Sequence, residues 1–125
     1  MRFSLFLAIA AAVASVACAS AARAPSASDE MHIGTQAAQR GYWQEALFRF
    51  ARARVQDPSN AEILNNQAVA LEALGRYDEA LAVYKQALQL APKNTVIRKN
   101  YARFAEFFTS YARGVRPKGL ADASH

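Results

Sequence analysis

Cysteine and histidine are almost absent from this sequence. Its 125 residues include one cysteine, Cys18, and two histidines, His32 and His125. A single cysteine excludes an internal disulfide, so packing has to hold the fold together. Neither histidine has a neighbouring cysteine or a pair of carboxylates at the spacing of a metal or catalytic site. The sequence therefore predicts no catalytic residues, no metal site, no cofactor and no enzymatic activity.

Glycine is also scarce, and strand patterns are missing. The five glycines stand singly, so no glycine-rich loop is available to bind a phosphate group. No segment alternates polar and apolar residues with period two, which argues against β-strands. The expected fold class is therefore all-α, without a small-molecule substrate.

Five helices can be placed from helix-end signals. The first is expected over residues 29–40, with Ser28 or Asp29 as its N-cap. The second begins near residue 43 and ends before Pro58, which cannot continue a helix. The others are expected over residues 61–74, 77–90 and 95–113.

The second and fourth helices are related by a shift of 34 residues. The segment from residue 41, GYWQEALFRFARARVQDPSN, aligns with GRYDEALAVYKQALQLAPKN from residue 75. The identical pairs are Gly41/Gly75, Glu45/Glu79, Ala46/Ala80, Leu47/Leu81, Ala53/Ala87, Pro58/Pro92 and Asn60/Asn94. Aromatic residues also align, Trp43 with Tyr77 and Phe50 with Tyr84. A period of this length indicates stacked helical hairpins.

Small residues recur where an amphipathic helix would usually carry leucine. Antiparallel helices joined by a tight turn approach closely only where side chains are small. We therefore expect Ala46, Ala53, Ala80 and Ala87 to lie at close helix contacts. Gly41 and Gly75 are expected to provide the left-handed backbone that ends each first helix.

These residues resemble the tetratricopeptide repeat family. Residues 61–94 carry the resemblance through Leu64, Ala68, Leu71, Leu74, Gly75, Tyr77, Ala80, Tyr84, Ala87, Leu90 and Pro92. Residues 27–60 do so through Gly34, Gly41, Trp43, Ala46, Phe50, Ala53 and Pro58. The resemblance implies two helical hairpins and a capping fifth helix in a short right-handed α-solenoid. Glu30, Met31 and His32 are unusual for the buried side of its first helix.

In that family, the first helices of successive repeats line a concave groove that binds an extended peptide or a partner helix. Carried over residue by residue, the groove would expose side chains from three helices. They are Met31, Thr35 and Ala38, then Asn65, Val69 and Glu72, then Lys99, Arg103 and Glu106. The alternative is a solvated face that binds nothing. Met31 and Thr35 do not fit the carboxylate clamp of some relatives, so that specificity is not transferred.

The fifth helix carries more aromatic residues than one packing face requires. Tyr101, Phe104, Phe108 and Tyr111 recur at helical spacing, and Phe107 widens the stripe. These residues either cover the fourth helix or leave a surface for another protein. Phe104 and Phe107 are the candidates for that interface.

The N-terminal residues resemble an export signal. An apolar run follows Arg2, and the tetrapeptide that ends in Cys18 resembles the lipobox of bacterial lipoproteins. Ser15 departs from the usual leucine of that motif, and cleavage at Ala17-Cys18-Ala19 or Ala19-Ser20-Ala21 is the alternative. We therefore expect a signal peptide over residues 1–18, a tether over residues 19–28, the repeat domain over residues 29–112 and a disordered tail over residues 113–125.

The charge balance is basic, with 15 lysines and arginines against 10 acidic residues. An exported protein meets no nucleic acid in the envelope, so acidic proteins or lipid head groups suit this charge better. The sequence thus predicts an exported protein-interaction module of the bacterial periplasm, either anchored to the outer membrane through lipidated Cys18 or free in the periplasm. The alternative is an accessory subunit of an envelope secretion or pilus assembly, whose partners complete the short stack.

Overall fold

The computed structural model describes residues 23–114, and this part of the chain forms five α-helices without a strand. The helices are α1 (Ala27–Gln39), α2 (Trp43–Gln56), α3 (Ala61–Ala73), α4 (Tyr77–Leu90) and α5 (Thr95–Ala112). The predicted all-α class is confirmed, and the boundaries of the last four helices agree with the sequence-based expectation to within a residue or two.

The start of α1 was predicted incorrectly. The helix begins at Ala27, and its N-cap is Ser26, not Ser28 or Asp29. The Ser26 hydroxyl accepts a hydrogen bond from the Asp29 amide at 3.2 Å, and the Asp29 carboxylate accepts one from the Ser26 amide at 2.8 Å. This reciprocal capping box satisfies two amides that a helix start otherwise leaves unpaired. The last two residues of the expected tether, Ala27 and Ser28, therefore belong to the helix.

The turns within the hairpins depend on glycine. Gly41 follows α1 with a φ of 77°, and Gly75 follows α3 with a φ of 75°. Side chains other than glycine rarely adopt this left-handed conformation, so both positions are as expected from the sequence. Each turn brings the next helix back beside the one that it follows.

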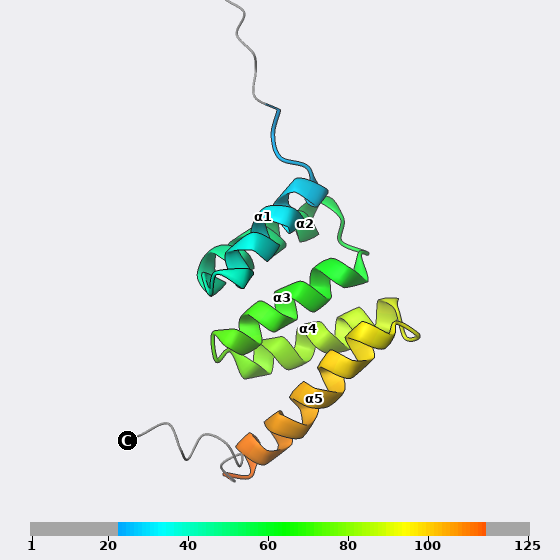
Figure 1. The fold of residues 1–125 in the computed structure, drawn as a ribbon. Helices are drawn as coiled ribbons and strands as arrows, with labels where there is room; N and C mark the ends of the chain where they lie inside the picture. Colours follow the sequence, from blue (N-terminus) through cyan, green and yellow to red (C-terminus); the bar gives the residue numbers. More distant parts are fainter. Residues whose placement is uncertain (1–22, 115–125) are drawn as a thin grey trace, which may run out of the picture.

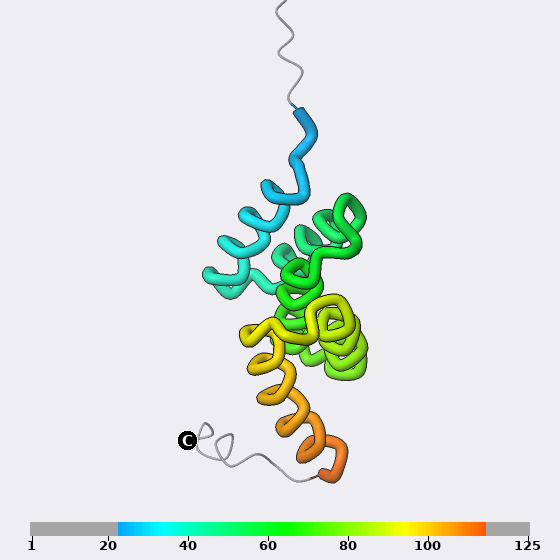
Figure 2. Tube along the Cα trace, turned by 90° about the vertical axis from the view of Figure 1, so that its right-hand side faces the viewer, coloured from blue at the N-terminus to red at the C-terminus, as the bar shows by residue number. Residues whose placement is uncertain are grey.

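The helices form two layers. Helix α1 packs on α2, and α3 packs on α4, while α2 contacts α3 and α4 contacts α5 to join the successive units (Figure 1). In the turned view, α1 and α5 lie on one side of the stack and α4 on the other (Figure 2). Backbone contacts join α1 to α3 and α3 to α5, whereas α2 and α4 make none with each other. The layer of α1, α3 and α5 is therefore the inner layer of the curve.

Alanines occupy the closest contacts between these layers. Ala46, Ala53, Ala80 and Ala87 are all 0% exposed, as the spacing predicted. Large side chains such as Tyr84 and Phe104 fill the space beside them and are fully buried. Close backbone approach and packed rings thus form the core together with buried leucines such as Leu64 and Leu71.

Several sequence-based predictions concern residues outside the described part. The described part does not include the predicted signal peptide over residues 1–18, with Cys18, or the first residues of the tether. It also leaves out nearly all of the predicted tail over residues 113–125. Within residues 23–114, none of the helices is both long enough and apolar enough to cross a bilayer.

Candidate functional site

Two adjoining hollows lie on the inner layer. The smaller has a volume of about 110 Å³ and is lined by Thr35, Ala38, Trp43, Phe50, Asn66 and Val69. The larger has a volume of about 360 Å³ and is lined by Trp43, Val69, Glu72, Ala73, Tyr77, Arg103 and Phe107. Trp43 and Val69 line both, so the two hollows form one groove that crosses α1, α3 and α5. This groove is the candidate site.

Trp43 and Tyr77 are groove residues that the carry-over from the first helices missed. Each is the first residue of a second helix, two positions after the glycine that ends the preceding helix. The tight turn therefore places an aromatic ring at one end of each hairpin, beside the groove. The alignment of Trp43 with Tyr77 is visible in the sequence, but the sequence alone does not place these rings beside the groove.

A buried tyrosine fixes the charged residues of the groove. The Tyr84 hydroxyl donates to Oε2 of Glu72 at 3.0 Å, and Nη2 of Arg103 donates to the same oxygen at 3.1 Å. Burial, followed by the charge of Glu72, raises the pKa of Tyr84, so its hydroxyl stays protonated and can donate. Glu72 is mostly buried, whereas the Arg103 side chain is 61% exposed. The groove therefore presents a cation held in place by a carboxylate beneath it.

Asn65 was expected to be exposed, and this expectation is wrong. Its side chain is 5% exposed and lies between α3 and α5. Its amide oxygen accepts a hydrogen bond from Asn100 at 3.1 Å, and its amide nitrogen donates to Asn66 at 3.3 Å. Both polar atoms of the Asn65 side chain thus have a hydrogen-bond partner, as buried polar groups require. Asn65 therefore connects helices and is not available to a ligand.

The other predicted groove residues separate into two groups. Thr35, Ala38, Val69, Glu72 and Arg103 line the groove as expected. The remaining three do not: Met31 lines a hollow at the start of α1, Lys99 lines a hollow at the end of the stack, and Glu106 is exposed without lining any of these hollows.

Of the two aromatic residues of α5 predicted to form an interface, one is buried in the core and the other lines the groove. Phe104 is 0% exposed, with its ring centroid 5.3 Å from that of Tyr84, so its assignment to an interface is wrong. Phe107 is half-buried and lines the groove, with its ring packed edge-on against Tyr77 at 5.0 Å. Phe107 therefore contributes both to the contact of α5 with α4 and to the groove surface.

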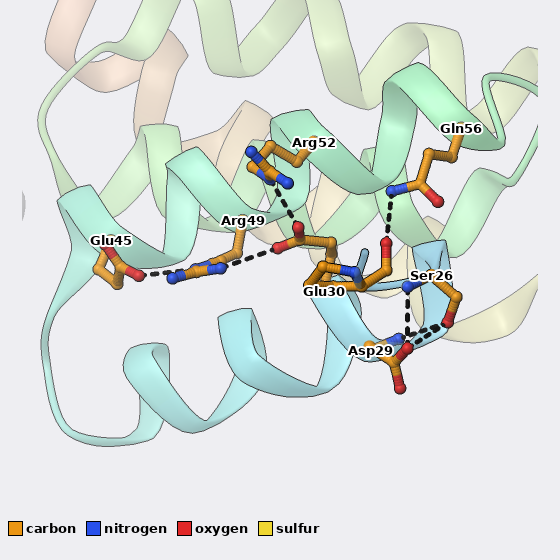
Figure 3. Close-up of polar contacts among 8 residues, drawn as sticks. Ser26, Asp29, Glu30, Glu45, Arg49, Arg52 and Gln56 are labelled. Carbon is orange, nitrogen blue, oxygen red and sulfur yellow. Dashed lines mark hydrogen bonds and ion pairs between the residues drawn. The ribbon is translucent and has the colours of Figure 1, made fainter. Parts of the chain in front are cut away.

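A second polar cluster lies in the first hairpin, away from the groove. Glu30 is fully buried and accepts hydrogen bonds from Nε of Arg52 at 2.6 Å and from Nη1 of Arg49 at 3.2 Å (Figure 3). Arg49 also donates to Glu45 at 2.7 Å. The hydrogen bond from Arg52, reinforced by Arg49, lowers the pKa of Glu30. The sequence marked Glu30 as unusual but did not identify its partners.

Comparisons with known proteins agree with this architecture. Uncharacterized protein y4yS of Sinorhizobium fredii is 39% identical over 56 residues, which is 45% of this chain and 31% of that protein. The chain thus matches less than a third of the length of this relative. Two solved structures, MamA of AMB-1 and a MamA mutant, each superpose with a TM-score of 0.59 at 24% identity. Each match covers 70% of this chain and 48% of MamA. At that identity, the likeness shows the fold.

The family assignment follows from the repeats themselves. The tetratricopeptide repeat profile matches residues 33–95, half of the chain, and the match includes both turns, the groove residues of α3 and all of α4. Proteins with this repeat generally act as non-catalytic scaffolds for other proteins. The chain belongs to the tetratricopeptide repeat family.

Proposed function

We propose that this protein is an interaction module that binds an extended peptide or a partner helix of another protein along its groove. The single observation that supports this most directly is the groove itself. It joins two hollows across three helices and combines aromatic walls, Trp43, Tyr77 and Phe107, with the fixed pair of Glu72 and Arg103. Apolar surface with a few oriented polar groups is typical of a binding site.

The groove chemistry indicates what a ligand would offer. An apolar side chain would lie over Val69, between the rings of Trp43 and Phe107. Arg103 has five N–H donors and uses one on Glu72 in this structure, so it can also donate to a peptide carbonyl or carboxylate. The expected ligand is therefore a peptide with an apolar anchor beside a hydrogen-bond acceptor.

A blocking substitution tests this proposal. Ala73 is exposed and lines the groove, so Ala73→Trp would fill the groove without displacing a core side chain. A photo-crosslinking amino acid at Thr35 should give a discrete crosslinked product in cells, and Ala73→Trp should abolish that product. The matched control is Ala82→Trp, at an exposed position of α4 that does not line the groove, and it should leave the product intact. A product that survives Ala73→Trp would contradict groove binding.

We also propose that the chain is exported to the bacterial envelope and attached to a membrane through Cys18. The lipobox-like sequence before Cys18 supports this placement. Cys18→Ser should move the protein from the membrane fraction to the soluble fraction after cell lysis, because a thioether-linked lipid needs the sulfur. Equal membrane retention of both proteins in a salt wash would contradict lipidation.

A further inference from the structure

The hollow at the end of the stack is separate from the groove. It has a volume of about 540 Å³ and lies where α4 turns into α5. Leu88, Tyr101 and Ala102 provide apolar surface, and Arg98 and Lys99 provide two cations. Neither cation forms an ion pair with a carboxylate within residues 23–114. This surface therefore combines apolar and unneutralised basic side chains.

The repeat shows what kind of structure fits this hollow. The equivalent positions of the preceding repeat lie 34 residues earlier in the sequence. For Leu88, Arg98, Tyr101 and Ala102 they are Arg54, Leu64, Gln67 and Ala68. In that earlier unit, α4 covers the equivalent surface. Leu64 and Ala68 are buried in one cluster with Ala80 and Tyr84, and Arg54 donates to Gln67 and Gln86 at 3.0 and 2.6 Å. The hollow is therefore the place of the second helix of a third repeat.

The three units differ in charge at one equivalent position. The residue is Glu30 in α1, Leu64 in α3 and Arg98 in α5, each 34 residues apart. Glu30 is covered by Arg49 and Arg52 of α2. Leu64 is buried in one cluster with Val83, which is equivalent to Arg49. In both units the covering helix matches the residue at this position, so acidic residues at the places of Arg49 and Arg52 would match Arg98.

We propose that an acidic helix of another protein docks on this end of the stack as the missing second helix. Its docking face would follow the register of α2 and α4. Four consecutive positions would be an acidic residue, an aromatic residue, any residue and a second acidic residue. Phe50 and Tyr84 hold the aromatic place in α2 and α4. Ala102 is exposed and equivalent to Ala68, so it would contact that ring.

None of the 125 residues of the sequence offers this pattern. No two acidic residues stand three positions apart anywhere in the sequence. Residues 1–22 contain no acid, and residues 115–125 contain only Asp122. Residues 1–22 and 115–125, in this chain or in a second copy of it, therefore do not match the pattern, which favours a different protein. The proposal concerns a different surface from the groove and does not depend on groove binding.

A designed peptide provides a test with the full chain. The acidic probe is a stapled helical peptide with the sequence of Tyr77–Leu90 carrying Val83→Glu and Gln86→Glu. The matched control carries Val83→Arg and Gln86→Arg. We expect fluorescence anisotropy to show at least about tenfold tighter binding of the acidic peptide, weakened by added salt. Arg98→Glu in the protein should reverse this preference.

Two blocking variants identify the surface. Ala102→Trp fills the hollow and should abolish binding of the acidic peptide, whereas Ala73→Trp fills the groove and should leave it unchanged. Circular dichroism melts should show that both variants fold. Equal binding of the two peptides, or the same preference after Arg98→Glu, would overturn the proposal. So would loss of binding in Ala73→Trp alone, which would assign the peptide to the groove.

Discussion

Glu30 occupies a position where the next repeat has Leu64, and it is buried with its charge. Two guanidinium groups from α2 satisfy its carboxylate, and Glu30 is 0% exposed. A buried carboxylate that loses its charge leaves its cationic partners without compensation. Glu30 therefore joins the two helices of the first hairpin by charge, whereas Leu64 joins those of the second by apolar contact.

We expect Glu30→Gln to lower the melting temperature at pH 7 by several degrees, because Arg49 and Arg52 then lack their buried partner. The matched control is Glu79→Gln, which breaks an exposed ion pair with Arg76 and should change the melting temperature much less. Equal effects of the two substitutions in thermal denaturation would contradict a role for burial.

The hydrogen bonds of Glu30 also predict that the stability of the protein depends on pH. Hydrogen bonding in the folded state lowers the pKa of Glu30 from its usual 4.5, so its contribution to stability is fully present above that value. The contribution is lost as the pH falls through the lowered folded-state pKa. Melts of the wild type and Glu30→Gln should therefore differ most near neutral pH and converge below pH 4.5. A constant difference down to low pH would exclude Glu30 as the titrating group.

At the scale of the helix, small side chains decide how α2 and α4 pack. Four alanines are fully buried where these helices approach their neighbours. In α1 the constraint is tighter, since a Cβ added to Gly34 would lie 2.6 Å from Cε1 of Phe50. Ala68, the equivalent residue of α3, has room for its methyl group beside Tyr84. The two hairpins therefore share a plan but differ in how closely their helices approach.

Ala80→Leu should lower the free energy of unfolding by about 1 to 3 kcal/mol through overpacking, although leucine is more hydrophobic. Ala82→Leu is the matched control, because Ala82 lies on the exposed side of the same helix. Urea denaturation of both variants provides the comparison. A stability of Ala80→Leu equal to that of the wild type would contradict close packing at this position.

At the scale of the molecule, two clusters of buried side chains form one continuous core. One cluster spans α3, α4 and α5, and the other joins α1 and α2 to Ala70 of α3. Leu47 of α2 packs against both clusters, so it connects them. In stacked repeats, stability depends on such contacts between neighbouring units. Damage at one end of the stack should therefore reach the other.

Phe104→Ala tests this coupling. Phe104 is fully buried in the last helix, and its truncation should cost about 3 to 5 kcal/mol. Trp43 is the only tryptophan and lies in the first hairpin, so its fluorescence reports on the opposite end. We expect Trp43 fluorescence and helical circular dichroism to shift together to lower denaturant. Phe48→Ala, at a 52% exposed position, is the control with a small effect. Separate transitions for the two signals would show that the repeats unfold independently.

The sequence by itself determined the five helices, the hairpin turns, the alanine contacts and the repeat family. These features depend on local signals, such as glycine, proline and cap residues, and on a period that recurs within the chain. The tertiary structure alone decided which polar and aromatic side chains are available to a ligand. It buried Glu30 against two arginines of α2, paired Asn65 with Asn100, placed Phe104 in the core and brought Trp43 and Tyr77 to the groove. The reason is physical: exposure and pairing depend on side chains from other helices, and their distances are set only when the helices pack.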